Sequence, residues 1–362
     1  MHFGEALDDD RLGALLRPGD GVETVITADV YGQGAADALV GQALSGLPRA
    51  TYALVGAIGH DFYAGERDGP RGFPRFTQPA LRGPGEYADY LRTATERSLE
   101  RCGVDAFDVV LLHNPDRTGY SSPAVWEGMA ALREAGLTRE VGVAPGPANG
   151  FTLDLIACLE RFAAVIDWAM VILNPLEPWP GELVLDAARA SGVRVITRVV
   201  DYGGLFWDDV LPGHAFAAGD HRNFRPAGWV QAGRQRMEAM RPIAQRRDLG
   251  MLQLAAAWNL AHPAVACAAP TLIQEPGTGA RPVEDKRAEL ARVASGPALS
   301  ADEVAAIRAA GDNAGTMALK GASPDHQGEE RPDRWPVSPE LAAAGARWGV
   351  DADRDLAQVA AA

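Results

Sequence analysis

The chain has very little lysine. Of its 34 basic residues, only Lys286 and Lys320 are lysines, and all the others are arginines. The part of the chain before Lys286 therefore contains no ammonium side chain to act as a nucleophile, a proton donor or a counter-ion. Arginine in place of lysine, together with abundant alanine and glycine, is also typical of the codon bias of a GC-rich genome.

Basic charge and cysteine are scarce as well. The formal net charge is −14, from 34 basic and 48 acidic residues in 362, which argues against nucleic-acid and anionic-membrane partners. Three widely separated cysteines suit a reducing compartment without a disulfide framework. No apolar run approaches the roughly 18 residues of a spanning helix, and the start lacks the pattern of a secretory signal. We expect a cytoplasmic protein that is a monomer or a small homo-oligomer.

Short β-branched runs alternate with helical patterns along most of the chain. Strands that are apolar on both faces and separated by helices are typical of a covered parallel sheet. No GxGxxG turn follows the first strand, so an open dinucleotide-binding sheet has no support. The repeated alternation predicts an α/β protein with a (β/α)8 TIM barrel. Strands are expected at 22–27, 52–55, 107–112, 140–144, 165–173, 193–200 and 264–269.

We expect the barrel to span residues 1–295 and a C-terminal extension to span 296–362. Residues 1–4 are all that remains for the first strand, so either this stub closes the barrel or the native start lies upstream. A long polar loop, rich in glycine, proline and arginine, follows the third strand. In the extension, Ser300 and Glu303 form a capping-box pattern, and Trp335 favours packing against the barrel.

Polar side chains follow the strands at their carboxyl ends, where barrels of this type hold their sites. Carboxylates, amides and arginine are suited to binding the hydroxyl groups of a polyhydroxylated small molecule. Tyr31, His60 and His113 are the candidate acid–base residues. Histidine and carboxylate residues without tight spacing do not favour a metal site. The predicted substrate-binding residues are Asp29, Asp61, Asn114, Asn174, Glu177, Trp179, Arg198 and Asp201.

Several segments, in this order, resemble the aldo-keto reductases. They include Thr-Ala-Asp-Val-Tyr-Gly-Gln-Gly at 27–34, Ser-Leu-Glu-Arg-Cys-Gly-Val-Asp at 98–105, Phe-Asp-Val-Val-Leu-Leu-His-Asn-Pro-Asp at 107–116, and Leu-Arg-Glu-Ala-Gly-Leu at 132–137. The resemblance covers about residues 1–310, and 73–116 look most similar to the aldose (L-fucose-type) dehydrogenase branch. It implies a barrel that oxidises or reduces a sugar-like aldose or carbonyl with NADP or NAD.

The resemblance also implies a catalytic tetrad, and only half of it is present. In the family a tyrosine exchanges a proton with the substrate, a lysine lowers the pKa of that tyrosine, an aspartate holds the lysine, and a histidine orients the carbonyl. Tyr31 and His113 match the tyrosine and the histidine, whereas Ile26 and Ala57 stand at the aspartate and lysine positions. His60, as an imidazolium, is a candidate replacement for the missing positive charge.

The cofactor contacts are likewise only partly kept. The Ser-Asn pair that holds the nicotinamide amide in the family is Ala144-Pro145 here, and the glutamine position is Met170. The residues that the resemblance implies for cofactor binding are Gly203, Gly204, Leu205, Arg281, Glu284 and Lys286.

Three functions remain open from the sequence. The first is a diverged NADP- or NAD-dependent oxidoreductase with a degenerate tetrad. The second is a lyase, epimerase or isomerase that acts on a sugar or keto sugar through Tyr31 and His113 and uses no nicotinamide. The third is a barrel that binds a small molecule without catalysis.

Overall fold

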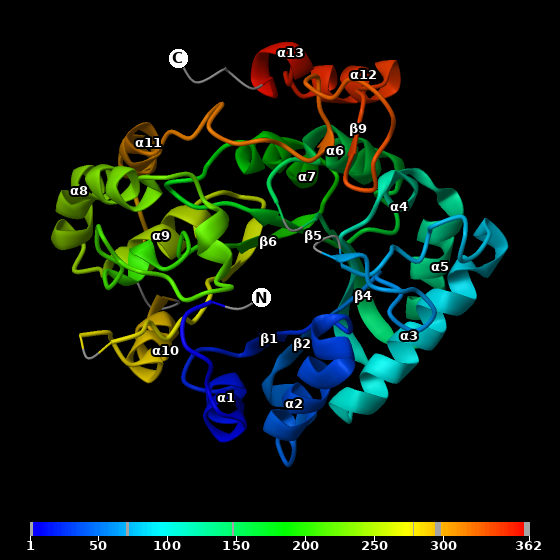
Figure 1. The fold of residues 1–362 in the computed structure, drawn as a ribbon, viewed down its shortest axis with the longest axis horizontal. Coiled ribbons are helices and arrows are strands. Elements are labelled where there is room, and N and C mark those ends of the chain that lie inside the picture. The colour runs from blue at the N-terminus through cyan, green and yellow to red at the C-terminus, as the bar shows by residue number, and fades with distance from the viewer. Residues whose placement is uncertain (1–2, 70–71, 147, 278, 294–297, 358–362) are drawn as a thin grey trace.

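The computed structural model describes residues 3–69, 72–146, 148–277, 279–293 and 298–357. Seven parallel strands form one curled sheet in which each strand pairs with the next strand along the chain, and helices lie outside it (Figure 1). This is the predicted α/β architecture of the (β/α)8 type. The strands are β1 (Thr24–Ile26), β2 (Ala53–Ile58), β3 (Phe107–His113), β4 (Thr138–Ala144), β5 (Trp168–Ile172), β6 (Arg194–Arg198) and β7 (Val265–Ala269).

The start of the chain does not form the expected strand where the structure describes it. Residues 1 and 2 of the expected stub lie outside the described residues. The backbone N–H of Gly4 donates to a carboxylate oxygen of Asp220 at 2.8 Å, and that of Glu5 donates to the carbonyl of Gln274 at 2.8 Å. These N–H groups are bound to a side chain and a loop rather than to a ladder, so over the described residues β1 and β7 are the edges of the sheet.

The helices follow the expected pattern between the strands. The predicted capping box is formed, since the side chain of Ser300 accepts a hydrogen bond from the backbone N–H of Glu303. The longest helix, at 229–246, begins directly after Gly228, which has a φ of 79°. The main helices are α1 (Asp9–Leu16), α2 (Ala35–Leu44), α3 (Tyr87–Cys102), α4 (Arg117–Ser121), α5 (Pro123–Glu134), α6 (Thr152–Arg161), α7 (Leu185–Ala190), α8 (Trp229–Arg246), α9 (Met251–Leu260), α10 (Val283–Ala291), α11 (Ala301–Ala310), α12 (Pro339–Arg347) and α13 (Ala352–Asp355).

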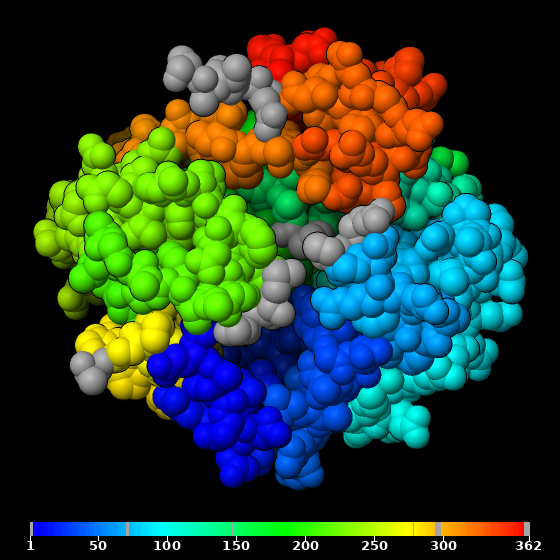
Figure 2. All heavy atoms as spheres, viewed as in Figure 1, coloured from blue at the N-terminus to red at the C-terminus, as the bar shows by residue number. Residues whose placement is uncertain are grey.

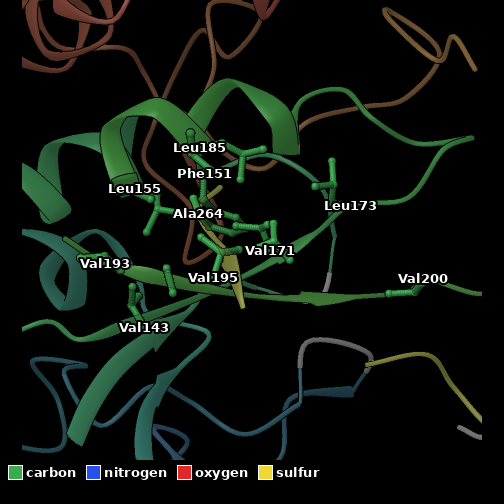
Figure 3. Close-up of a cluster of buried hydrophobic side chains, with 14 of the residues drawn as sticks. Val143, Phe151, Leu155, Val171, Leu173, Leu185, Val193, Val195, Val200 and Ala264 are labelled. Atoms are coloured by element: carbon green, nitrogen blue, oxygen red, sulfur yellow. The ribbon is translucent and has the colours of Figure 1, made fainter. Parts of the chain in front are cut away.

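Side chains alternate between the two faces of the curled sheet. On the outer face, Val143, Val171 and Val195 from three adjacent strands pack against Leu155 of α6 and Leu185 of α7 (Figure 3). This cluster buries most of the apolar surface, which is the main source of stability. The inner face carries a separate cluster of mostly smaller side chains, namely Ala28, Val55, Ala57, Val109, Leu111, Ala144, Met170 and Ile196.

The C-terminal segment lies against α6 (Figure 1). Asp154 of α6 is buried and accepts hydrogen bonds from the indole N–H of Trp335 and the backbone N–H of Ala322, both at 2.8 Å. Two short parallel strands, β8 (Gly321–Ala322) and β9 (Arg334–Trp335), carry these donors. A buried carboxylate on the barrel therefore anchors the extension. No helix in the described parts of the chain has the length and apolar character needed to cross a membrane.

Candidate active site at the mouth of the barrel

Three predicted acid–base residues meet at the carboxyl ends of the first three strands. His113 is the last residue of β3, His60 follows β2, and Tyr31 begins the short turn after β1. The ring of His113 lies edge-on to both other rings, with centroids 5.7 Å from Tyr31 and 5.3 Å from His60. His113 is buried, whereas Tyr31 is 55% exposed. The three side chains therefore form one cluster with an open side.

Hydrogen bonds fix the ring of His60 in place. Nδ1 lies 3.0 Å from the carbonyl oxygen of Phe73, and Nε2 lies 3.0 Å from the side-chain amide of Asn114. A neutral ring that donates from Nδ1 and accepts at Nε2 satisfies both contacts. Arg75 reaches the same ring at 3.2 Å and also donates to the backbone carbonyl of Asn114. His60 thus links the long loop to the end of β3.

Both histidines are neutral at physiological pH, so the predicted imidazolium at His60 is wrong. Burial and the positive charge of Arg75 lower the pKa of His60 to about 4. Burial, with His60, Arg75 and Arg198 close by, lowers the pKa of His113 well below its ordinary value. In each case the low-polarity surroundings and the neighbouring cations penalise a second positive charge.

Acid should destabilise the fold through these two rings. A histidine whose pKa is lower in the folded state binds more protons when unfolded, so its stabilising contribution is present above about pH 6.5 and disappears as the pH falls toward 4. For His60 the total effect is roughly 3 kcal/mol, at about 1.4 kcal/mol per pKa unit. Urea unfolding at pH 7 and at pH 4.5 should show a smaller loss in His60→Gln than in the natural protein. An equal loss in both proteins would contradict the buried neutral ring.

Arg198 is the cation whose charge acts on the phenol of Tyr31. It ends β6, and its guanidinium donates to the carbonyl oxygens of Pro145 at 3.3 Å and Gly146 at 2.5 Å. Desolvation raises the pKa of Tyr31 above its ordinary value, and the charge of Arg198 partly opposes this. Tyr31 is therefore a protonated phenol at neutral pH, with a positive charge near its oxygen.

Asp29 is buried beside this cluster and is not exposed at the rim. Neither carboxylate oxygen has a hydrogen-bond partner among the described residues, and the side chain has no exposed surface. Burial and the nearby charge of Asp37 raise the pKa of Asp29 well above its ordinary value. This carboxyl group therefore loses its proton less readily than an exposed aspartate does.

Four of the predicted substrate-binding side chains are committed to bonds within the protein. Asp61 pairs with Arg82, and Asp201 accepts the backbone N–H groups of Gly204 and Thr271. Asn174 accepts the N–H groups of the next turn and donates to the carbonyl of Val199, while the indole N–H of Trp179 donates to the carbonyl of Asp355. All four are buried and hold loops in place.

The remaining polar residue of that region also has protein partners. Glu177 is buried and lies 3.5 Å from a guanidinium nitrogen of Arg225, and it accepts from the side-chain amides of Asn149 at 3.4 Å and Asn174 at 3.3 Å. Arg225 in turn stacks over the rings of Tyr202 and Trp229. Glu177 and Arg225 therefore bond to and pack against other side chains of the protein at the rim.

No lysine enters the cluster. Ile26 and Ala57, at the positions where the resemblance implies an aspartate and a lysine, belong to the apolar cluster inside the barrel. The only two lysines are paired elsewhere, Lys286 with Asp209 at 2.6 Å and Lys320 with Asp333. The positive charge near the phenol comes from arginine instead.

Charged side chains of the protein pack against the glycine turn after β6. Gly203 and Gly204 have φ angles of 65° and 98°, and Leu205 is fully buried. The buried guanidinium of Arg222 donates to the carbonyl of Gly203 and pairs with both Asp220 and Glu275. A Cβ atom at Gly204 would lie 3.0 Å from Glu275 and 3.2 Å from Arg222, so the turn is closely packed.

The charged residues predicted for the cofactor phosphate are also engaged. Arg281 pairs with Glu289 at 2.7 Å, Glu284 with Arg11 at 2.5 Å, and Lys286 has no exposed surface. A phosphate group needs N–H donors or cations that are free to face it. In this arrangement these residues do not fit a dinucleotide phosphate, because each of them already has a protein partner.

Two features of the site had no counterpart in the sequence predictions. Arg75 lies in a loop with several other arginines, and nothing in its local pattern distinguishes it. Asp37, in the first turn of α2, is fully buried and bonded to Thr27, Ser98 and Arg101. Only an unusual acidic residue on an otherwise apolar helix face could have indicated Asp37.

The face that carries these strand ends is hollowed at its centre, between the blue N-terminal and the light-green segments (Figure 2). Across the described residues, no group of three or more histidine, cysteine, aspartate or glutamate side chains could hold a metal ion. The side chains of the cluster offer proton transfer and hydrogen bonding by a phenol and neutral imidazoles, next to guanidinium groups.

Comparison with known proteins identifies the family. The model of the aldo/keto reductase family matches residues 17–277. Versiconal hemiacetal acetate reductase of Aspergillus parasiticus is 21% identical over 283 residues, which cover 67% of this chain and 72% of that protein. The glycerol dehydrogenase AKR11B4 of Gluconobacter oxydans has a TM-score of 0.65 at 21% identity and covers 84% of this chain and 86% of its own.

A third relative is seen with a cofactor. An aldo-keto reductase of Klebsiella pneumoniae in complex with NADPH has a TM-score of 0.52 at 20% identity, with 83% of this chain and 82% of that chain covered. The family match spans most of the barrel and includes Tyr31 and His113. The chain belongs to the aldo/keto reductase family and is an aldo-keto-reductase-like oxidoreductase.

Proposed function

We propose that this protein interconverts an alcohol and a carbonyl group in a sugar-like, polyhydroxylated small molecule at the mouth of the barrel. One observation carries the proposal: a protonated phenol, Tyr31, and a neutral imidazole, His113, lie with their ring centroids 5.7 Å apart at the ends of two strands. A proton donor and a second hydrogen-bonding group at such a separation can address one carbonyl oxygen.

In the reduction direction, Tyr31 gives its proton to the carbonyl oxygen. Its raised pKa keeps the phenol protonated before the reaction. His113, being neutral, has one N–H that can donate to the same oxygen and orient the carbonyl. As the proton leaves, negative charge develops on the phenol oxygen, and the guanidinium of Arg198 stabilises that charge. Oxidation follows the same steps in reverse.

The hydride partner is proposed from the family to be NADP or NAD, and it is directly testable. Titration of the natural protein with NADPH and with NADH should quench its tryptophan fluorescence, and absorbance at 340 nm should report aldose-dependent reduction of NADP or NAD. Because the phosphate-side charges are paired within the protein, we expect binding to weaken less with salt than it would for an open cationic site. If neither nucleotide binds, the redox proposal fails.

A non-redox acid–base reaction is the second candidate, and the paired charges at Arg281, Glu284 and Lys286 favour it. A lyase, epimerase or isomerase would use Tyr31 and His113 on a sugar or keto sugar without nicotinamide. Incubation with aldoses and ketoses in D2O without nucleotide should then place deuterium at a substrate carbon. Full deuterium incorporation by both Tyr31→Phe and His113→Ala would refute this reading.

A further inference from the structure

Two partly buried arginines flank the candidate active site without a carboxylate partner. Arg75 touches His60, Arg198 acts on Tyr31, and the charges of both reach His113. Within the described residues, neither guanidinium lies within 4.0 Å of a carboxylate oxygen. Arg222, in contrast, pairs with two carboxylates beside the turn that follows β6. The two arginines at the active site therefore lack the direct counter-charge that Arg222 has.

The protein holds each of these guanidinium groups by only some of its nitrogens. Arg75 uses Nε on the carbonyl of Asn114, while its Nη1 lies 3.2 Å from Nδ1 of His60, which carries a proton in this tautomer and does not accept a hydrogen bond. Arg198 uses Nη2 on the carbonyls of Pro145 and Gly146. The described protein atoms make no hydrogen bond to Nη2 of Arg75 or to Nε and Nη1 of Arg198. Each group is thus positioned by backbone oxygens and still has donors to offer.

Among the described residues no nearby carboxylate bonds directly to either guanidinium, although the charge of Asp116 acts on Arg75 and that of Glu177 acts on Arg198. Tyr31 and the two histidines are neutral at physiological pH. The carboxylate of Asp61 is held by Arg82, and that of Asp116 accepts from the hydroxyl of Thr77 and the backbone N–H of Gly119. Two guanidinium groups of the active-site side therefore lack a directly bonded carboxylate, in a chain whose net charge is −14. Keeping two guanidinium groups partly desolvated in this way is costly unless an anion pairs with them.

We propose that Arg75 and Arg198 bind an anionic group of the substrate, so that the substrate is an anionic sugar derivative rather than a neutral aldose. The anion can be the carboxylate of a sugar acid or the phosphate of a sugar ester, since guanidinium donors suit both. This inference rests on the proposed function for the location of the reacting carbon. The anion site itself is defined by the two arginines.

Binding without turnover tests the inference. Isothermal titration of the nucleotide-free protein uses D-gluconate, D-sorbitol 6-phosphate and neutral D-sorbitol as probes. At least one of the two anions should bind about tenfold or more tightly than sorbitol, and added NaCl should reduce that advantage. The comparison of gluconate with the phosphate ester identifies the preferred anion. Equal affinity for all three probes, or no binding of either anion, would overturn the proposal.

Charge-removing variants locate the site. Arg198→Gln and Arg75→Gln should each weaken the bound anion about 10-fold to 100-fold and leave sorbitol binding unchanged. Arg246→Gln, an exposed arginine on α8, is the matched control and should change nothing. Arg198→Lys keeps the charge and should restore part of the affinity, which separates loss of charge from damage to the fold. Anion binding unchanged in both Arg75→Gln and Arg198→Gln would also overturn it.

The outcome of these binding measurements does not depend on whether the proposed function is correct. Nucleotide and turnover are absent from the titrations, so a missing hydride partner does not affect them. Conversely, an enzyme that turns over neutral aldoses with no preference for anionic ones would keep its proposed function and lose this inference.

Discussion

Tyr31→Phe should reduce turnover by about 100-fold to 10,000-fold, the range that a positioned general acid contributes. The phenylalanine ring keeps the edge contact with His113 and removes only the hydroxyl group. Because Tyr31 is exposed and its side chain makes no hydrogen bond within the described residues, the free energy of unfolding should change by less than about 0.5 kcal/mol. Steady-state kinetics together with urea unfolding measure the two effects separately.

A tyrosine away from the site provides the matched control. Tyr52 precedes β2, at the opposite end of that strand from His60, and is packed under Arg49. Tyr52→Phe should leave turnover within a factor of about two. If Tyr31→Phe retains the activity of Tyr52→Phe, the phenol is not the proton donor.

His113 and the phenol of Tyr31 should contribute to the same step of the reaction. His113→Gln keeps an N–H donor at the end of β3, so it should reduce turnover less than His113→Ala does. If both groups address one oxygen, the double variant of Tyr31→Phe and His113→Ala should lose little more than the worse single variant. Multiplied losses would instead place the two side chains on separate steps.

The meeting of Tyr31 and His113 could be predicted from the sequence because it depends on topology. Parallel strands bring their carboxyl ends to one rim, so residues just past β1 and β3 approach each other wherever such a sheet forms. The order of strands and most helices follows from apolar periodicity for the same reason. Topology alone brings residues to the rim and does not determine the partner of any of them.

Partners depend on how loops return to the rim, and this is where the sequence predictions were less useful. Asp61 carries a carboxylate that could bind sugar hydroxyl groups, but Arg82, from the far end of the same loop, forms an ion pair with it. His60 could have been a cation, but Arg75 approaches its ring and favours the neutral form. Both outcomes depend on the path of a long loop without periodicity, which local patterns do not specify.

The largest stability effect should come from Arg222. Its side chain is fully buried and pairs with Asp220 at 2.8 Å and Glu275 at 2.5 Å. Although burial opposes it, bonding from Arg222 and from backbone N–H groups lowers the pKa of Asp220 to about 2. Arg222→Gln would leave two buried carboxylates without their cation, and removing one partner of such a group costs about 3–5 kcal/mol. Urea unfolding at pH 7 measures the loss.

Two further variants separate loss of the cation from a general packing defect. Arg92→Gln removes an exposed pair with Glu96 on α3 and should cost no more than about 0.5 kcal/mol. Adding Glu275→Gln to Arg222→Gln removes one of the orphaned charges and should recover part of the stability, because a neutral pair tolerates burial better than a lone carboxylate.

The pH dependence of the stability loss has a defined sign. Without Arg222 the pKa of Asp220 rises, so the deficit should shrink as the pH falls from 7 toward 5 and the carboxylates take up protons. A deficit that is the same at both pH values would point to lost packing over the Gly203–Gly204 turn instead of lost charge pairing.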